Sequence, residues 1–148
     1  EMCIRDSNEK EHQHVASLLQ IVSDIERISD YCENISEYAE NLANQKKKFS
    51  GVGAAEMKEM LEVCSDSFTY AVEAFEENSA EKALKVIEKE RSADDLEIRL
   101  RADHMQRLAN KQCDTEAGIV FLDALVGLER ISDHSRNIAE EVLSASNK

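Results

Sequence analysis

Apolar residues in the first third of the chain recur at alternating spacings of three and four. This series predicts an amphipathic helix over about residues 9–48. Its members are Leu18, Ile21, Ile25, Ile28, Cys32, Ile35, Ala39 and Leu42. The lysines at 46–48 suit the negative end of a helix, and Gly51-Val52-Gly53 is expected to end it. Residues 1–8 show no clear periodicity, so we expect a linker or non-native segment there.

Three further helices are expected after this one. A second apolar face over residues 54–78 predicts one helix, a third helix follows over 80–110, and a fourth ends near residue 146. Asn78 or Ser79 is the expected cap of the third helix, and Asp114 or Thr115 that of the fourth. Because the connections are short and proline is absent, the sequence predicts an all-α antiparallel helical bundle of four long helices.

The fourth predicted helix has apolar residues on every side between Ile119 and Leu128. This is typical of a helix that is buried all round or that faces a partner. Burial is the more common case, and it is the one we expect. Ile119, Leu122 and Val126 nevertheless form an apolar strip that suits a partner helix, so an interaction module is an alternative function.

The net charge of −13 narrows the range of partners. Nucleic acid is excluded, because binding to phosphates requires clustered Lys and Arg, and the only basic run is 46–48. No run is apolar and long enough to span a membrane, so direct membrane insertion of this segment is not expected. The four cysteines form no CxxC pair, which favours a reducing, cytoplasmic compartment.

The pentapeptide Glu-Arg-Ile-Ser-Asp occurs twice, at residues 26–30 and 129–133, at a constant offset (129 − 26 = 103). The match continues downstream, where Asn34, Ile35 and Glu37 correspond to Asn137, Ile138 and Glu140. The shared pattern is E-R-I-S-D-x-x-x-N-I-x-E. Since chance explains such a register poorly, the first and fourth helices are an internal repeat.

The acidic residues of each copy share one helical face. At about 100° per residue, Glu26, Asp30 and Glu37 fall within roughly 40° of one another and well over 90° from Ile28 and Ile35. The same arithmetic holds for Glu129, Asp133 and Glu140. We therefore expect these carboxylates to face away from the core of their helix. Ferritin-like metal bundles, a less favoured alternative, direct their ligands inward.

Like charges one turn apart repel each other, so their repetition suggests compensation by cations. Glu90 and Asp94 repeat the E-x-x-x-D spacing on the third helix, on a line that begins apolar at Ala83 and Ile87 and then turns charged. The candidate metal ligands are Glu129, Asp133, Glu90, Asp94, Glu26 and Asp30. The metals considered are Fe, Zn, Mn and Mg. The alternative is a set of solvated faces, with Arg27 and Arg130 pairing with neighbouring acids.

Catalytic groups are not recognisable in the sequence. There is no Ser-His-Asp or Cys-His arrangement and no glycine-rich phosphate loop, so no catalytic or cofactor-binding residue is assigned and the chain is not expected to be an enzyme. The four histidines, His12, His14, His104 and His134, are scattered. Each is expected to be solvated or hydrogen-bonded rather than a metal ligand.

These motifs resemble the PhoU family of phosphate-uptake regulators, whose hallmark is a repeated E-R-I-G-D helix. Ser29 and Ser132 stand where the family has glycine, and residues 86–94 look like its acidic middle helix. The resemblance covers about Val15 to Val142. It implies that residues 54–146 form a complete three-helix bundle and that 9–48 is the last helix of a preceding bundle whose other helices are missing.

The resemblance also implies a function. Family members regulate phosphate uptake without being enzymes and bind metal clusters on the bundle surface. The serine substitutions suit the cytoplasmic C-terminal region of bacterial sodium/phosphate cotransporters. A membrane phosphate transporter, in the same chain or a separate one, is therefore the expected partner, at the inner face of the plasma membrane. A homo-oligomer is a further expectation.

Overall fold

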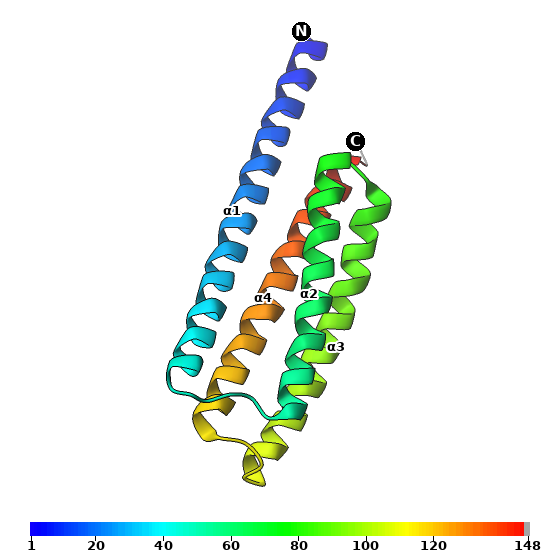
Figure 1. Ribbon diagram of the computed structural model, residues 1–148. Helices are drawn as coiled ribbons and strands as arrows, with labels where there is room; N and C mark the ends of the chain where they lie inside the picture. The colour runs from blue at the N-terminus through cyan, green and yellow to red at the C-terminus, as the bar shows by residue number, and fades with distance from the viewer. Residues whose placement is uncertain (147–148) are drawn as a thin grey trace.

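The computed structural model describes residues 1–146 of the 148-residue chain. Four antiparallel helices follow one another, α1 (Met2–Asn44), α2 (Gly51–Glu77), α3 (Ala80–Ala109) and α4 (Thr115–Ser146) (Figure 1). No strand occurs within the described residues. The predicted all-α class and its four long helices are confirmed.

The four helices share one hydrophobic core, but they do not all contact one another. α2, α3 and α4 pack against one another, whereas α1 packs against α4 alone (Figure 1). The core of the three mutually packed helices includes Met60, Leu100, Phe121 and Leu125, each almost fully buried. α4 is therefore the central helix, with neighbours on three sides.

Local signals set the helix boundaries. The Ser50 hydroxyl accepts a hydrogen bond from Gly53 N–H, so α2 begins at Gly51 and not at residue 54. The glycines expected to break the chain thus form the first turn of α2. Ser79 and Asp114 cap α3 and α4 in the same way, as predicted, by accepting from the backbone N–H of Lys82 and Ala117.

The start of α1 differs from the prediction. Residues 2–8, expected to be a linker or non-native segment, continue the helix (Figure 1). Every residue from 1 to 16 is exposed. The segment contains neither glycine nor proline, and extending an existing helix needs no new nucleus. Helical structure here therefore follows from local preference without tertiary packing.

The apolar seam of α1 divides into two rows. Ile21, Ile28 and Leu42 are buried against α4. The alternate row, with Ile25 and Cys32, is exposed, contrary to the expectation of a single buried seam. The physical reason is that α1 has only one neighbouring helix, which covers one row and not both.

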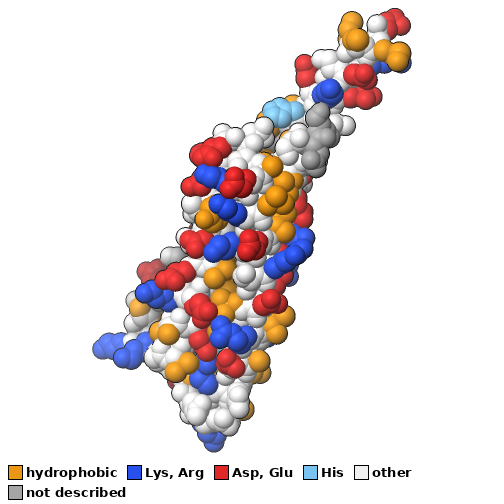
Figure 2. Space-filling view, turned by 90° about the vertical axis from the view of Figure 1, so that its right-hand side faces the viewer, with side chains coloured by type: hydrophobic (Ala, Val, Ile, Leu, Met, Phe, Trp, Pro, Cys, Tyr) orange, Lys and Arg blue, Asp and Glu red, His pale blue; other side chains and the backbone are white. Residues whose placement is uncertain are grey.

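α4 is buried on most of its circumference but not all round. Ile119 and Val126 remain 54% and 38% exposed, while Leu122 is half-buried. The expectation of complete burial was thus wrong for this strip. Three neighbouring helices leave one side of α4 open. Charged side chains of both signs and exposed apolar side chains are interspersed on the molecular face in Figure 2.

Candidate metal centre between α3 and α4

Three of the predicted ligands meet where α3 packs against α4. Glu90, Asp94 and Asp133 each place a carboxylate oxygen within 4.8 Å of the others. Oxygen atoms at this separation fit around a single hard cation, which binds oxygen ligands at about 2.0–2.6 Å. Within residues 1–146, this is the one group of three or more acidic, histidine or cysteine ligands that converges in this way.

The helix pattern explains why these carboxylates converge. Glu90 and Asp94 are one turn apart on α3, on the line whose earlier members, Ala83 and Ile87, are buried and half-buried. This line faces α4, so its charged continuation meets α4 at Asp133. Glu90 is 3% exposed, which confirms that the α3 line turns charged while still inside the contact.

Glu129 lies at the edge of this group and shares its electrostatic field. Burial, followed by the charge of Asp133, raises the pKa of the Glu129 carboxyl to about 7. Burial also raises the pKa of Glu90, together with a hydrogen bond and the charge of Asp94, whereas Arg136 opposes this shift. Removal from solvent, and after it the neighbouring negative charges, favours the protonated form of both carboxyls.

The two copies of the repeat differ in environment. Glu26, Asp30 and Glu37 are exposed, as the helical geometry predicted. On α4, Asp133 faces α3, and both Glu129 and Asp133 are half-buried. Carboxylates on the side of α4 opposite its Ile131 and Ile138 seam thus meet α3, because α4 has a neighbouring helix on that side too. Glu26 and Asp30 belong to no converging group among the described residues.

A basic residue that the sequence analysis did not select completes the site. Arg136 Nη1 donates to Glu90 at 3.0 Å, and its Nε donates to Glu140 at 2.9 Å. The i, i+4 spacing of Arg136 and Glu140 is visible in the sequence. The contact with Glu90 depends on the packing of α3 against α4 and has no local signal.

Asp24 is a second polar residue that sequence reasoning missed. It is 2% exposed on α1 and accepts hydrogen bonds from His134 Nδ1 at 2.8 Å and Asn137 Nδ2 at 3.1 Å. Both bonds end on Asp24 Oδ1, which accepts from the Asn137 amide, so His134 Nδ1 is assigned as the donor of its bond. Asp24 lies between Ile21 and Ile28 on the buried row of α1, so its position in the heptad was the available signal. As expected, His134 is hydrogen-bonded.

The buried thiol of Cys64, beside the site, has low reactivity. Cys64 on α2 donates from its thiol to the carbonyl of Leu128, and burial, with the charges of Glu129 and Asp133, raises its pKa to about 12. A thiol with so high a pKa stays protonated at neutral pH, and the protonated thiol is a poor nucleophile and a poor metal ligand. All four cysteines are free.

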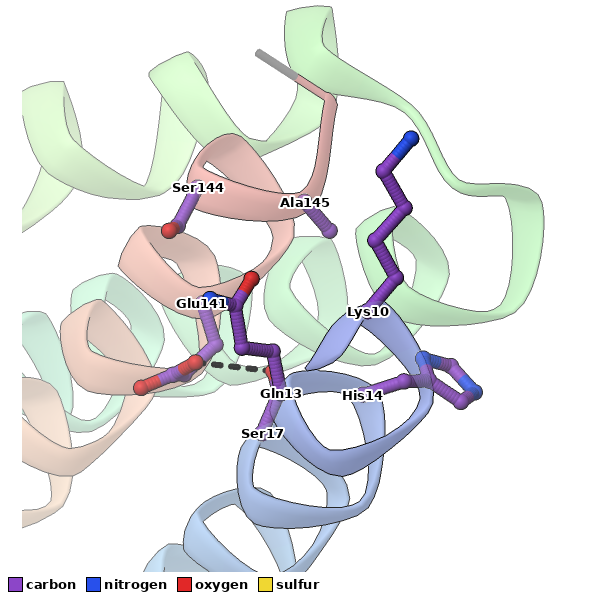
Figure 3. A pocket seen from close by; sticks show the side chains of 7 residues that line it. All are labelled: Lys10, Gln13, His14, Ser17, Glu141, Ser144 and Ala145. Atoms are coloured by element: carbon purple, nitrogen blue, oxygen red, sulfur yellow. Dashed lines mark hydrogen bonds between the residues drawn. The ribbon is translucent and has the colours of Figure 1, made fainter. Parts of the chain in front are cut away.

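A separate hollow lies where α1 crosses the end of α4 (Figure 3). Its lining comes from both helices: Lys10, Gln13, His14, Ser17, Glu141, Ser144 and Ala145. The Ser17 hydroxyl donates to Glu141 across it at 2.7 Å. Glu141 follows Asp133 by roughly two helical turns, so this hollow is distinct from the carboxylate group.

No helix among the described residues is long and apolar enough to cross a membrane. The protein is thus a helical bundle with a duplicated acidic helix. One copy of that helix, in α4, contributes to a group of carboxylates between two helices. The sequence profile of the PhoU domain matches residues 1–39 and 57–142. The chain therefore belongs to the PhoU domain family.

One sequence relative and one solved structure are similar to the chain, the structure in its fold. The chain is 29% identical over 138 residues to phosphate-specific transport system accessory protein PhoU homolog 1 of Thermotoga maritima, covering 90% of this chain and 57% of that protein. The fold of the present chain is similar to the crystal structure of PhoU from Pseudomonas aeruginosa, with a TM-score of 0.85 and 24% identity. The match covers 93% of this chain and 65% of the other. The chain thus spans less than two thirds of either relative.

Proposed function

We propose that this chain is a non-enzymatic regulatory module of phosphate transport that binds metal ions at Glu90, Asp94 and Asp133, with Glu129 at the edge of the site. Family membership and the accessory role named for the Thermotoga maritima relative support the regulatory part. The observation that supports metal binding is the convergence of three carboxylates within 4.8 Å. Bound metal would neutralise the crowded charges and fix α3 against α4.

The proposal extends to a partner and a compartment. A membrane phosphate transporter at the cytoplasmic face is the partner that suits an accessory role. The serines at 29 and 132 favour the intracellular region of a sodium/phosphate cotransporter, where the transporter would be part of the same polypeptide. Regulation would then pass through the helices that carry the metal rather than through any chemical step.

The repeat supplies a matched test for the metal site. Titration calorimetry with Mn²⁺, Fe³⁺, Zn²⁺ and Mg²⁺ is compared for wild type, Glu129→Gln/Asp133→Asn, and the control Glu26→Gln/Asp30→Asn. Both variants replace the same two acids of the same motif by their amides. Binding that survives in the control and is lost in the α4 variant supports the proposal, whereas equal loss in both would show only a general charge effect.

A second candidate function is an interaction module without metal. The exposed side chains of Ile119 and Val126, with Leu122 between them, favour it, because they form an apolar strip on the open side of α4. The two functions are compatible. A wild-type protein that shows no metal-dependent heat would leave the interaction module as the better description.

A further inference from the structure

Arg136 holds the most buried carboxylate of the candidate metal centre. Its guanidinium donates to Glu90 at 3.0 Å, and the side chain of Glu90 is only 4% exposed. A carboxylate so far from solvent requires a counter-charge, and removing that charge leaves an uncompensated anion. In this structure, the positive charge comes from the protein itself.

The metal ion of the proposed function would use the same carboxylate. A hard cation lies at about 2.0–2.6 Å from its oxygen ligands, so a metal on Glu90 would stand within a few ångströms of the guanidinium. Two cations at that distance repel each other strongly in a partly buried site. We propose that Arg136 is the resident counter-ion of this centre and that a metal ion must displace it from Glu90 to bind. This inference rests on the proposed metal site.

The structure provides a place for the displaced side chain. Arg136 is 40% exposed, and its Nε already donates to Glu140, which lies one turn further along α4 and is 50% exposed. The guanidinium can therefore leave Glu90 while keeping an anionic partner in solvent. Metal binding would move Arg136 from a buried to an exposed carboxylate, which makes it a competitor that sets the affinity of the centre.

Arg130 is the matched control. It lies on the same helix beside the same acidic group, but its side chain is 57% exposed and its Nε is 3.9 Å from Glu129. Arg136→Gln and Arg130→Gln lose the same formal charge. We expect Mn²⁺ to bind Arg136→Gln at least about five-fold more tightly than wild type, and Arg130→Gln within about two-fold, since exposed charges are largely screened.

Titration calorimetry with Mn²⁺ and the Mn²⁺-induced shift in Tm give two readouts for each variant. A Glu90→Gln background completes the test as a double-mutant cycle. There, at Mn²⁺ concentrations raised until the remaining carboxylates bind the ion, Arg136→Gln should bring no gain, because the carboxylate that Arg136 pairs with is gone. If Arg136→Gln folds poorly without metal, Arg136→Lys replaces it and should give a smaller gain, since a single ammonium cannot bridge Glu90 and Glu140 as the guanidinium does.

The outcomes separate the inference from the proposed function. Wild-type binding with no tighter binding in Arg136→Gln than in Arg130→Gln overturns the inference and leaves the metal site standing. A gain that persists in the Glu90→Gln background also overturns it, because Arg136 would then act through general charge alone. Absence of Mn²⁺ binding in all variants overturns the proposed function, and the inference with it.

Discussion

The ring of Tyr31 stacks on the ring of His134 with centroids 6.0 Å apart, and the two residues occupy the same position of the repeat (134 − 31 = 103). Equivalent positions that touch each other imply a local twofold axis between α1 and α4. Sequence differences between the two copies break this symmetry, and one of them lies at a buried position. The counterpart of the buried Asp24 is Gly127 (127 − 24 = 103), where Ile35 approaches so closely that a Cβ would lie 3.1 Å from its Cδ1.

The first prediction concerns this break in symmetry. Asp24→Ala should lower the free energy of unfolding by about 2–3 kcal/mol, because it leaves His134 Nδ1 and the Asn137 amide without an acceptor in the α1–α4 contact. Urea unfolding followed by circular dichroism measures the change. Hydrogen exchange should show the loss first in α1, which has α4 as its only neighbour.

Asp30→Ala is the control for this variant. Asp30 is also an aspartate of α1, but it is exposed, so its removal should change stability by no more than about 0.5 kcal/mol. An equal effect of the two substitutions would mean that the Asp24 network contributes nothing beyond its charge.

Much of the fold could be predicted because its signals are local. The caps at Ser79 and Asp114 and the apolar series of the helices depend on neighbours in sequence. The repeat was visible as identical residues at one offset. The charged continuation of the α3 line at Glu90 could also be predicted, since it lies on the same face as buried residues.

The rest could not be predicted because it depends on which helices are neighbours. A heptad pattern on α1 does not tell whether one partner or two will cover it, so the exposure of Ile25 was missed. The Arg136–Glu90 pair joins residues 46 positions apart and depends on the packing of α3 against α4. Contacts between residues of different helices cannot be predicted from the spacing of residues along one helix.

The second prediction concerns pH and Glu129. Its pKa is raised from 4.5 to about 7 in the folded chain, so the folded state holds an extra proton between these values. The resulting stability is fully present below pH 4.5 and is lost as pH rises through 7. With allowance for the partial exposure of the side chain, wild type in EDTA should lose about 1–2 kcal/mol more than Glu129→Gln between pH 5 and pH 8.

Unfolding in urea at a series of pH values gives this difference directly. Comparison with Glu129→Gln removes the contribution of the other titrating groups, including Glu90, which shifts in the same direction. Parallel pH profiles for the two proteins would contradict the prediction.

The third prediction compares two ion pairs between α2 and α3. Arg107 binds Glu56 through two nitrogens at 3.0 and 2.6 Å, with only 12% and 14% of the side chains exposed. Glu56→Ala should cost about 3 kcal/mol, because it leaves the guanidinium without an anionic partner in a largely buried position. Glu59→Ala breaks a pair with Arg99 whose members are 53% and 59% exposed, and should cost less than about 1 kcal/mol. Thermal unfolding of the two variants tests this order.

The fourth prediction uses the repeat to separate charge from position. Asp133→Asn removes one of three carboxylates whose oxygens lie within 4.8 Å of one another, so in EDTA it should stabilise the chain by about 1 kcal/mol through relief of repulsion. Asp30→Asn changes the equivalent residue of α1, which is exposed and outside the group, and should leave the free energy of unfolding unchanged.

With Mn²⁺ added, Asp133→Asn should no longer be more stable than wild type. The ion should raise the Tm of wild type and of Asp30→Asn alike, because both keep the three carboxylates between α3 and α4. It should leave Asp133→Asn with little or no shift, since an amide oxygen is a weaker ligand and carries no charge. Asp133→Asn could be stabilised in EDTA and still show the full Mn²⁺-induced rise in Tm. That result would mean that the carboxylates repel one another at this position but that the metal binds elsewhere on the chain.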